Sequence, residues 1–203
     1  MGIRMRGDFG TKVNALVRWL LYQKQQHDRW SGEGAAHMTG RVDDSLMETL
    51  DASEPPKALC FSQWGSELIL VGKALAMNNI SFVEFKGSLE QQSRAIHRFS
   101  NDPTVRVFLL STGTANAGLT LVSATSVFIL EPSLNPAIEE QAINRVHRIG
   151  QTRPTTIFRF VVMDSVEETI IDLVQSRKKC IAGASTAAED TRRSAVQVWL
   201  STT

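Results

Sequence analysis

The stretch that decides the fold is TSVFILEPSLNPAIEEQAINRVHRIGQTRPTTIFRFVVM, residues Thr125 to Met163. It opens and closes with runs rich in β-branched and aromatic residues, which predict two buried strands. Between them, the pair Asn135-Pro136 is typical of a helix start and Gly150 of a helix end. Because a helix that joins two strands makes a crossover connection, the stretch predicts parallel strands in one sheet.

The same alternation of strand and helix patterns extends outward over residues 57–178. Strands are predicted for KALCFS, SFVEF and VRVFLLS, and the segments that follow each of them have apolar residues at helical spacing. We therefore expect an α/β fold of three layers, with helices on both faces of a mainly parallel sheet. In such sheets ligands bind at the carboxyl ends of the strands. The predicted loops at that edge are SQW, KGS, STGTANAG and EPSLNP.

The predicted helix after EPSLNP has a distinctive arrangement of arginines. On a helix of about 100° per residue, Gln141, Arg145 and Arg148 share an arc of roughly 60°. A neighbouring arc holds the apolar residues Ile138, Ala142, Val146 and Ile149. Guanidinium groups placed on a rigid element suit phosphate oxygens, because their planar fork donates paired hydrogen bonds. The alternative is a solvated helical face with surface ion pairs to Glu139 and Glu140, and the helix alone does not decide between them.

Length and composition limit the class of protein. With 203 residues, 42% of them hydrophobic, the chain can bury one full core. Its apolar runs are far shorter than the roughly 20 residues that cross a bilayer, and no signal peptide opens the chain, so we expect an intracellular protein with no membrane partner. Cys60 and Cys180 are far apart and form no CxxC, which supports neither a disulfide framework nor a zinc site.

Charge is unevenly distributed along the chain and indicates its organisation. Residues 1–30 have six Lys or Arg and two Asp or Glu, whereas residues 31–56 have one and six. The second stretch also lacks a sustained apolar period, as flexible segments do. We predict four parts: an amphipathic lead-in helix (1–22), a disordered or flexible insertion (23–56), the α/β domain (57–179) and a flexible tail (180–203).

Taken together, these motifs resemble the second RecA-like lobe of the Swi/Snf-type helicase-like ATPases. ALCFSQW, VEFKGSLEQQSRAIHRF and the segment from LLSTGTANAG to VHRIGQT are similar to the motifs of that lobe and occur in the same order. The resemblance covers about residues 9–178, with 23–56 unmatched, and is strongest to the SHPRH-type branch. It implies a RecA-like fold of the P-loop NTPase type that lacks the P-loop itself.

The resemblance implies a task for the arginines. In such motors ATP lies between two lobes, and the second lobe contributes arginine fingers that stabilise charge on the transferring phosphoryl group. Arg145 and Arg148 match these fingers, and the resemblance assigns further ATP contacts to Gln141 and Gly118. His147 matches the motif as well, and an ordinary structural hydrogen bond is an equal reading for it. Mg²⁺ would be held by the first lobe.

The resemblance also implies a surface for the backbone of double-stranded DNA. Gly87, Ser88 and Thr112 match backbone contacts, with Ser62 and Gln63 nearby. Such contacts do not depend on base sequence and weaken with salt. Without the resemblance, each of these loops would only predict a turn.

Two motifs of a complete ATPase do not occur in this sequence. It contains no GxxxxGK[ST] and no DExx-type acidic pair after a hydrophobic strand. We therefore expect the chain to be inactive by itself as an ATP hydrolase. One hypothesis is that it is the catalytic second lobe of a DNA translocase in chromatin remodelling or DNA repair, working with a first lobe. The alternative is a non-catalytic remnant lobe that binds DNA or a protein.

The family implies further partners and a location. It predicts a nuclear protein whose partners are double-stranded DNA, the first RecA-like lobe of the same motor and, from the SHPRH-type branch, ubiquitin-ligase machinery.

Overall fold

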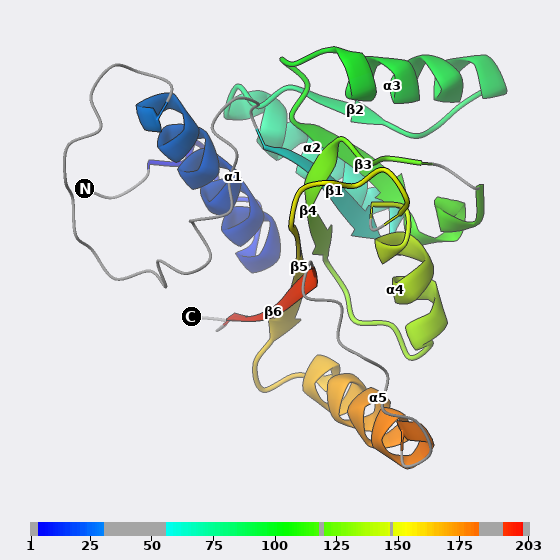
Figure 1. Ribbon diagram of the computed structural model, residues 1–203. Helices are drawn as coiled ribbons and strands as arrows, with labels where there is room; N and C mark the ends of the chain where they lie inside the picture. The colour runs from blue at the N-terminus through cyan, green and yellow to red at the C-terminus, as the bar shows by residue number, and fades with distance from the viewer. Residues whose placement is uncertain (1–3, 31–55, 118–119, 147, 183–192, 201–203) are drawn as a thin grey trace.

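The computed structural model describes residues 4–30, 56–117, 120–146, 148–182 and 193–200. Within them, six parallel strands form one sheet in the order β2-β3-β1-β4-β5-β6 (Figure 1). The strands are β1 (Lys57–Ser62), β2 (Phe82–Glu84), β3 (Val107–Ser111), β4 (Ala124–Ile129), β5 (Thr155–Val162) and β6 (Arg193–Leu200). The expected α/β fold with a parallel sheet is confirmed.

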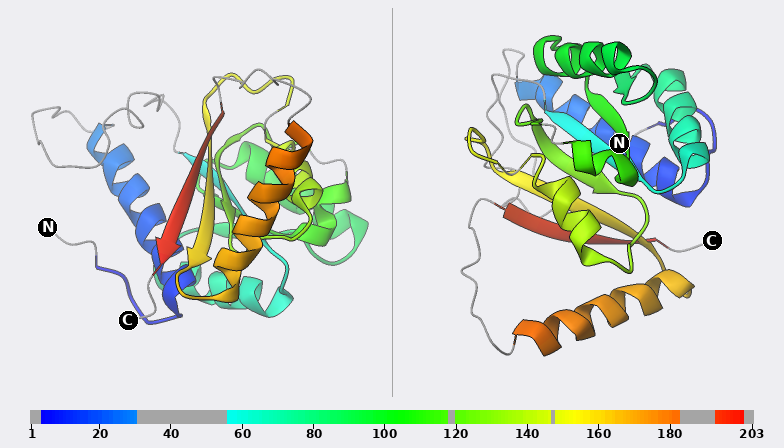
Figure 2. Two further views of the ribbon diagram at one scale, coloured as in Figure 1. Left: turned by 90° about the horizontal axis from the view of Figure 1, so that it is seen from below. Right: turned by 90° about the vertical axis from the view of Figure 1, so that its right-hand side faces the viewer.

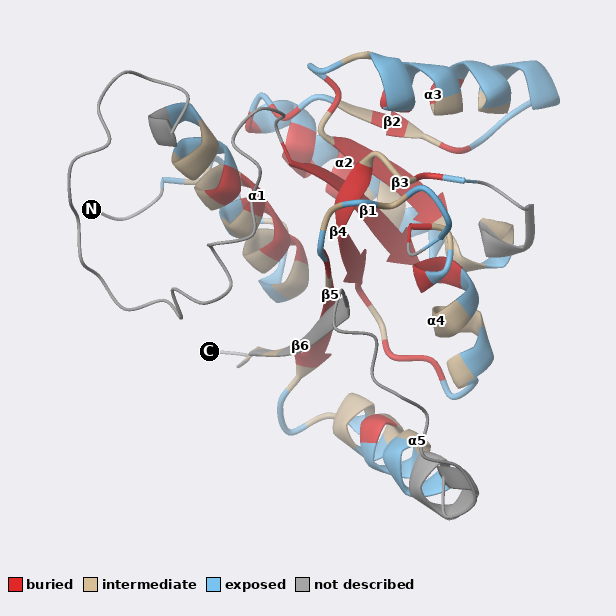
Figure 3. Ribbon diagram, in the orientation of Figure 1, coloured by how far each residue is buried: buried red, intermediate tan, exposed pale blue. Residues whose placement is uncertain are grey.

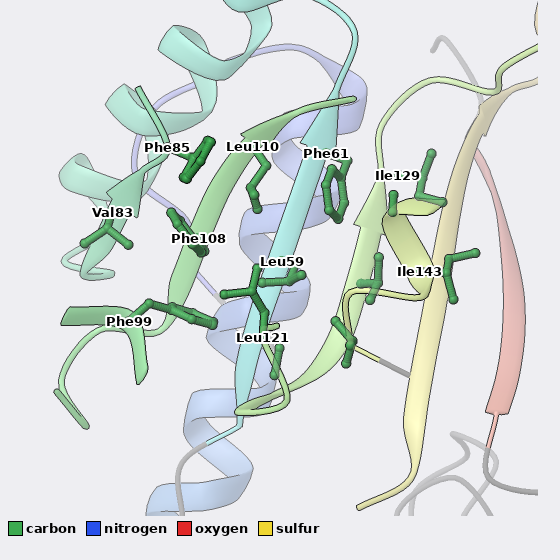
Figure 4. Close-up of a cluster of buried hydrophobic side chains, with 14 of the residues drawn as sticks. Leu59, Phe61, Val83, Phe85, Phe99, Phe108, Leu110, Leu121, Ile129 and Ile143 are labelled. Atoms are coloured by element: carbon green, nitrogen blue, oxygen red, sulfur yellow. The ribbon is translucent and has the colours of Figure 1, made fainter. Parts of the chain in front are cut away.

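Helices cover both faces of this sheet, as expected. They are α1 (Thr11–Trp30), α2 (Gly65–Met77), α3 (Leu89–Asn101), α4 (Pro136–Ile143) and α5 (Val166–Ala182), with a short 3-10 helix, η2 (Thr112–Ala117), after β3. Side chains that alternate along each strand point to opposite faces, so the core has two halves. Leu59 and Phe61 of β1 pack with α3 and α4 (Figure 4), whereas Ala58 and Cys60 pack with α1 and α2.

The central strands are buried along their whole length. Every residue of β1 and β4 is buried between the helical layers (Figure 3). Cys60 is one of these residues, and burial raises the pKa of its thiol, so it acts as a small core residue. None of the helices in the described residues is long and apolar enough to span a bilayer.

Helix α1 is longer than the sequence pattern predicts. The amphipathic segment was expected to end at residue 22, but α1 continues to Trp30 and its polar last turns contact the sheet. Gln23 is buried, and its amide donates to the hydroxyl of Ser126 in β4. The predicted boundary was wrong because this contact is made by a polar side chain, which an apolar period does not detect. Residues 31–55 of the predicted insertion lie outside the described residues.

Helix α1 packs against the sheet and shares its hydrophobic core. Val13, Leu16 and Val17 are almost fully buried against the sheet, and the ring of Trp19 lies 4.8 Å from that of Phe158 in β5. α5 lies on the opposite side of β5 from α1 (Figure 2). Lys12 connects the two sides, since its ammonium donates to the Leu130 carbonyl and to the Glu167 carboxylate at the start of α5.

The end of the chain also differs from the prediction of a flexible tail over 180–203. α5 extends to Ala182, and Arg193–Leu200 form β6, which pairs with the whole of β5 from Thr155↔Arg193 to Val162↔Leu200. The sequence SAVQVWL has the alternation of a strand, but the small polar residues before it obscured that signal. Residues 183–192 and 201–203 lie outside the described residues.

Candidate functional site

Loops from four neighbouring strands meet at one edge of the sheet. Because β1 to β4 are all parallel, their carboxyl ends lie together, and the loops SQW, KGS, STGTANAG and EPSLNP follow them as predicted. We call the residues that follow these strand ends, 63–64, 85–88, 112–114 and 130–135, the carboxyl-end rim.

The end of β1 is held at this rim by Glu131. Its carboxylate accepts a hydrogen bond from the Ser62 hydroxyl at 2.8 Å and one from the Gln63 backbone N–H at 3.0 Å. Ser62 is fully buried, so it positions the loop and does not present its hydroxyl at the surface. The predicted direct contact by Ser62 is therefore corrected to a supporting role. Gln63 is exposed and stays a candidate contact.

Gly87 and Ser88 form the start of α3. Gly87 has φ +86°, and a Cβ atom there would lie 2.0 Å from the Gln91 side-chain oxygen, so only glycine fits. The Ser88 hydroxyl accepts from the Gln91 backbone N–H, and the Gln91 side chain accepts from the Ser88 N–H, which makes a capping box. Both residues are exposed at the rim, and both also have a structural reason to be there.

Thr112 is the first residue of η2, directly after β3, and is half-buried. The turn that follows is closed by the Thr114 hydroxyl, which donates to the Ser111 carbonyl. Thr112 therefore lies at the rim as predicted. Gly118 lies outside the described residues.

The arginines do not lie on a helix. α4 ends at Ile143, with Asn144 as its C-cap, and Arg145 and Arg148 belong to the turns that follow. The backbone carbonyl of Arg145 accepts from the Leu121 N–H at 2.9 Å. Asn144 has a lower helix propensity than most residues, which favours a helix end at this position. Backbone groups that lose their helical partners there can instead bond to a distant segment, as the Arg145 carbonyl does. Ile149, expected on the buried arc, is 99% exposed.

Three side chains connect these turns to the residues that lead into β4. We call residues 144–153 the arginine turn and residues 120–124 the β4 entry. Arg148 donates to the Thr120 hydroxyl at 2.8 Å, and Arg153 donates to the Ser123 carbonyl at 2.7 Å. The Gln151 amide donates to the carbonyls of Val122 and Ala124, at 2.9 and 2.8 Å. The arginine turn is thus fixed by polar bonds along its length.

The arginine turn and the carboxyl-end rim lie at opposite ends of the strands. The β4 entry precedes Ala124, and the arginine turn precedes β5 at Thr155, so both lie at the amino ends of these strands (Figure 1). Only the start of α4 lies at the rim. The segment after EPSLNP therefore starts at the rim, whereas its arginines lie at the other end of the strands. Gln141 is exposed on the last turn of α4, and His147 lies outside the described residues.

The charges around the arginines differ from the surface-pair alternative. Glu139 makes its ion pair with Arg159 of β5, at 2.8 Å, with both side chains largely buried. Arg145 is half-buried, and its Nε–H is buried with no acceptor among the described residues. Such a donor is unfavourable unless something else accepts from it.

Glu131 of the rim lies close to a second carboxylate, that of Glu67 in the first turn of α2. Burial and the nearby Glu131 raise the pKa of Glu67, while Lys12 lowers it. Within the part of the chain that the structure describes, no group of three or more His, Cys, Asp or Glu could hold a metal ion.

The sequence predicts that Gln151 shapes the turn, but it predicts neither the partners of Gln151 nor a contact for Lys12. Neither residue belongs to an apolar period, and each acts through hydrogen bonds to distant backbone carbonyls. Glu131, the first residue of EPSLNP, anchors its loop to the end of β1.

Comparisons with known proteins agree with the fold. The model of the family described as "Helicase conserved C-terminal domain" matches residues 41–150. Among solved structures, the C-terminal part of the Fun30 ATPase domain superposes with a TM-score of 0.57 at 26% identity, over 79% of this chain and 54% of that one. The RecA-like fold is thereby confirmed.

Curated relatives are Swi/Snf-type helicase-like proteins. The human E3 ubiquitin-protein ligase SHPRH is 40% identical over 183 residues, which are 90% of this chain and 9% of that protein. The DNA repair protein RAD5A of Arabidopsis thaliana is 42% identical over 150 residues, 71% of this chain and 14% of that protein. The helicase-like transcription factor CHR28 of the same plant is also 42% identical, over 69% of this chain and 14% of its own length. The chain thus spans a small part of the length of each relative.

Proposed function

The chain belongs to the helicase conserved C-terminal domain family, and from this premise we propose that it is the second lobe of a DNA-dependent ATPase that translocates on double-stranded DNA. The observation that carries the proposal is the arginine turn. Two guanidinium groups lie three residues apart on a turn whose backbone and side chains are bonded to the β4 entry. A rigid mount of this kind suits the stabilisation of charge on a phosphoryl group.

In this proposal Arg145 and Arg148 act as arginine fingers toward ATP bound on a first lobe. The residues present fit a phosphate, since Arg145 has a buried N–H without an acceptor among the described residues and Arg148 is exposed. ATP supplies the phosphoryl group, with Mg²⁺ held by the first lobe. The arginines bind the γ-phosphate oxygens and stabilise the negative charge that grows there. Gln141 and Gly118 are proposed as further contacts to the nucleotide.

The carboxyl-end rim is proposed to bind the DNA backbone. Gln63, Gly87, Ser88 and Thr112 follow three adjacent strands and offer small side chains, hydroxyl or amide groups and backbone N–H groups. Such groups position a phosphate backbone without reading its base sequence. The bonds of Glu131 to the Ser62 hydroxyl and the Gln63 N–H hold the loop that carries this surface.

The names of the relatives suggest the setting. RAD5A is named a DNA repair protein and SHPRH a ubiquitin-protein ligase. We therefore propose a nuclear role in DNA repair or chromatin remodelling, with a first RecA-like lobe as the direct partner and ubiquitin-ligase machinery as a further one.

A reconstitution of the two lobes tests the proposal. The chain would be mixed with the separately expressed first lobe of a relative such as SHPRH, and ATP hydrolysis would be measured with and without duplex DNA. We expect hydrolysis only when both lobes and DNA are present. Arg148→Ala should lower the rate by about a thousandfold, because an arginine finger is worth that much or more.

The control is Arg94→Ala, which removes an exposed arginine of α3 whose ion pair is with Glu90 on the same helix, at 3.6 Å. It should leave the rate unchanged. If Arg148→Ala is as active as the unmodified chain, the arginine-finger role is wrong. If the mixture binds DNA but never hydrolyses ATP, the non-catalytic remnant lobe is the better description.

A further inference from the structure

Trp64 is an unusual residue on the carboxyl-end rim. Its side chain follows β1 directly and is 64% exposed. Trp19, by contrast, packs its ring between Tyr22 and Phe158. A large apolar side chain left in water at a ligand-binding edge contributes nothing to the core.

The position of Trp64 in its helix is also unfavourable. It is the N-cap residue of α2 and makes no side-chain capping bond. Ser, Thr, Asp and Asn are preferred there, because their side-chain oxygens accept from the first backbone N–H groups of the helix. Trp64 therefore breaks a local rule and gains neither burial nor a cap. Residues that do so without a structural benefit are expected at functional sites.

The backbone that carries this side chain is nevertheless fixed. The Trp64 N–H donates to the Ser62 hydroxyl at 3.0 Å, and its carbonyl accepts from the N–H groups of Glu67 and Leu68. Ser62 is itself bonded to Glu131. The backbone that carries the indole is thus fixed before a ligand binds, which lowers the entropy lost on binding.

The neighbours of Trp64 indicate the class of ligand. In the strand order β2-β3-β1, Gly87 and Ser88 follow the first strand, Thr112 the second, and Gln63 with Trp64 the third. Adjacent strands are about 4.8 Å apart, so these residues form a row on the scale of successive nucleotides. Hydroxyl, amide and backbone N–H groups bind phosphate and sugar, and an aromatic ring packs on bases, so this row offers two kinds of nucleic-acid contact.

We infer that Trp64 is a nucleic-acid contact, whose indole packs on the sugar and base surface of a strand while the rest of the row binds its phosphates. The inference rests on the proposed DNA binding of the rim and adds an apolar contact to it. A phosphate contact is electrostatic and weakens with salt, whereas contact with an aromatic ring does not. Trp64 should therefore account for the part of the affinity that persists as salt rises.

The test exploits the unfavourable cap. Trp64→Ser removes the indole and supplies the preferred capping group, so its thermal midpoint should equal or exceed that of the unmodified chain. Its affinity should nevertheless fall about tenfold, the size of one base–aromatic contact. Trp64→Phe should keep most of the affinity. Ile69→Ser, on the same helix and also exposed, is the matched control and should bind normally.

Binding would be followed by anisotropy of a fluorescein-labelled DNA duplex of mixed sequence, and of one of its strands alone, at two salt concentrations. A loss for Trp64→Ser on either probe, by the same factor at both salt concentrations, supports the inference, because a contact that does not depend on salt contributes a constant free energy. If Trp64→Ser binds both probes as the unmodified chain does, the indole serves a protein partner or none, and the inference falls while the DNA-binding rim stands. If the unmodified chain binds neither probe, both fall.

Discussion

The carboxyl-end rim and the arginine turn are fixed by different kinds of contact. At the rim, side-chain acceptors hold backbone N–H groups: Ser88 and Gln91 form a local capping box, and the Glu131 carboxylate accepts from the Gln63 N–H, 68 residues away. In the arginine turn, Gln151 and Arg153 bond to carbonyls 27 to 30 residues away in the chain. The comparison teaches that two surfaces of one lobe can be stabilised independently, with only the core and α4 in common.

The support that the two regions share is the ion pair of Arg159 with Glu139, which connects β5 to the first turn of α4. Arg159→Met should lower the free energy of unfolding by about 3 kcal/mol, because it leaves the Glu139 carboxylate largely buried with the Ser133 N–H as its one remaining donor among the described residues. Urea unfolding measures this loss. We expect faster amide exchange in both regions.

The double variant Arg159→Met with Glu139→Leu is the control and should recover much of the lost stability, because no charge is left buried. A loss below about 1 kcal/mol for the single variant would show that this pair contributes no more than a surface pair.

The sequence predicted the shared core better than either surface. Apolar periods gave the alternation of strands and helices, the parallel sheet and the burial of Cys60, because burial follows from residue type and spacing. They gave the rim loops too, because in a parallel sheet all strands end at one edge. The end of α4 at Ile143 was missed, because it depends on bonds such as that of the Leu121 N–H to the Arg145 carbonyl, which spacing does not encode.

Gln151→Ala should loosen the arginine turn alone. The variant removes two donors and leaves the carbonyls of Val122 and Ala124 to water, so we expect a loss of about 1–2 kcal/mol. Hydrogen exchange followed by mass spectrometry should show faster exchange at Leu121 and none of this change at residues 87–91.

Gln25→Ala is the matched control, since Gln25 is exposed on α1. It should alter neither stability nor exchange. Equal protection of Leu121 in Gln151→Ala and in the unmodified chain would mean that Arg148 and Arg153 suffice to fix the turn.

Ser88→Ala should loosen the rim alone. It removes the acceptor for the Gln91 N–H and one half of the capping box, which corresponds to about 1 kcal/mol. Exchange should rise in the first turn of α3 and stay unchanged at the β4 entry. Ser88→Asp sharpens the comparison, because it keeps the cap and places a negative charge where a phosphate is proposed to bind. It should be as stable as the unmodified chain and bind DNA more weakly; normal DNA binding would remove Ser88 from the proposed surface.

The smallest effect concerns the carboxylate of Glu67, in the first turn of α2 next to the rim. Burial and the charge of Glu131 raise the pKa of Glu67 above its ordinary value of 4.5. The folded chain therefore binds this proton more tightly than the unfolded chain, so the contribution of Glu67 to stability is full below pH 4.5 and is lost as the pH rises through the folded pKa. Glu67→Gln should raise the thermal midpoint slightly at neutral pH and not below pH 4.5. The effect is small because Glu67 is only half-buried and water screens its charge.

A matched change at Glu90, an exposed carboxylate of α3, should have no such pH dependence. If Glu67→Gln is less stable than the unmodified chain at neutral pH, the attraction of Lys12 outweighs burial and the charge of Glu131 at this carboxylate.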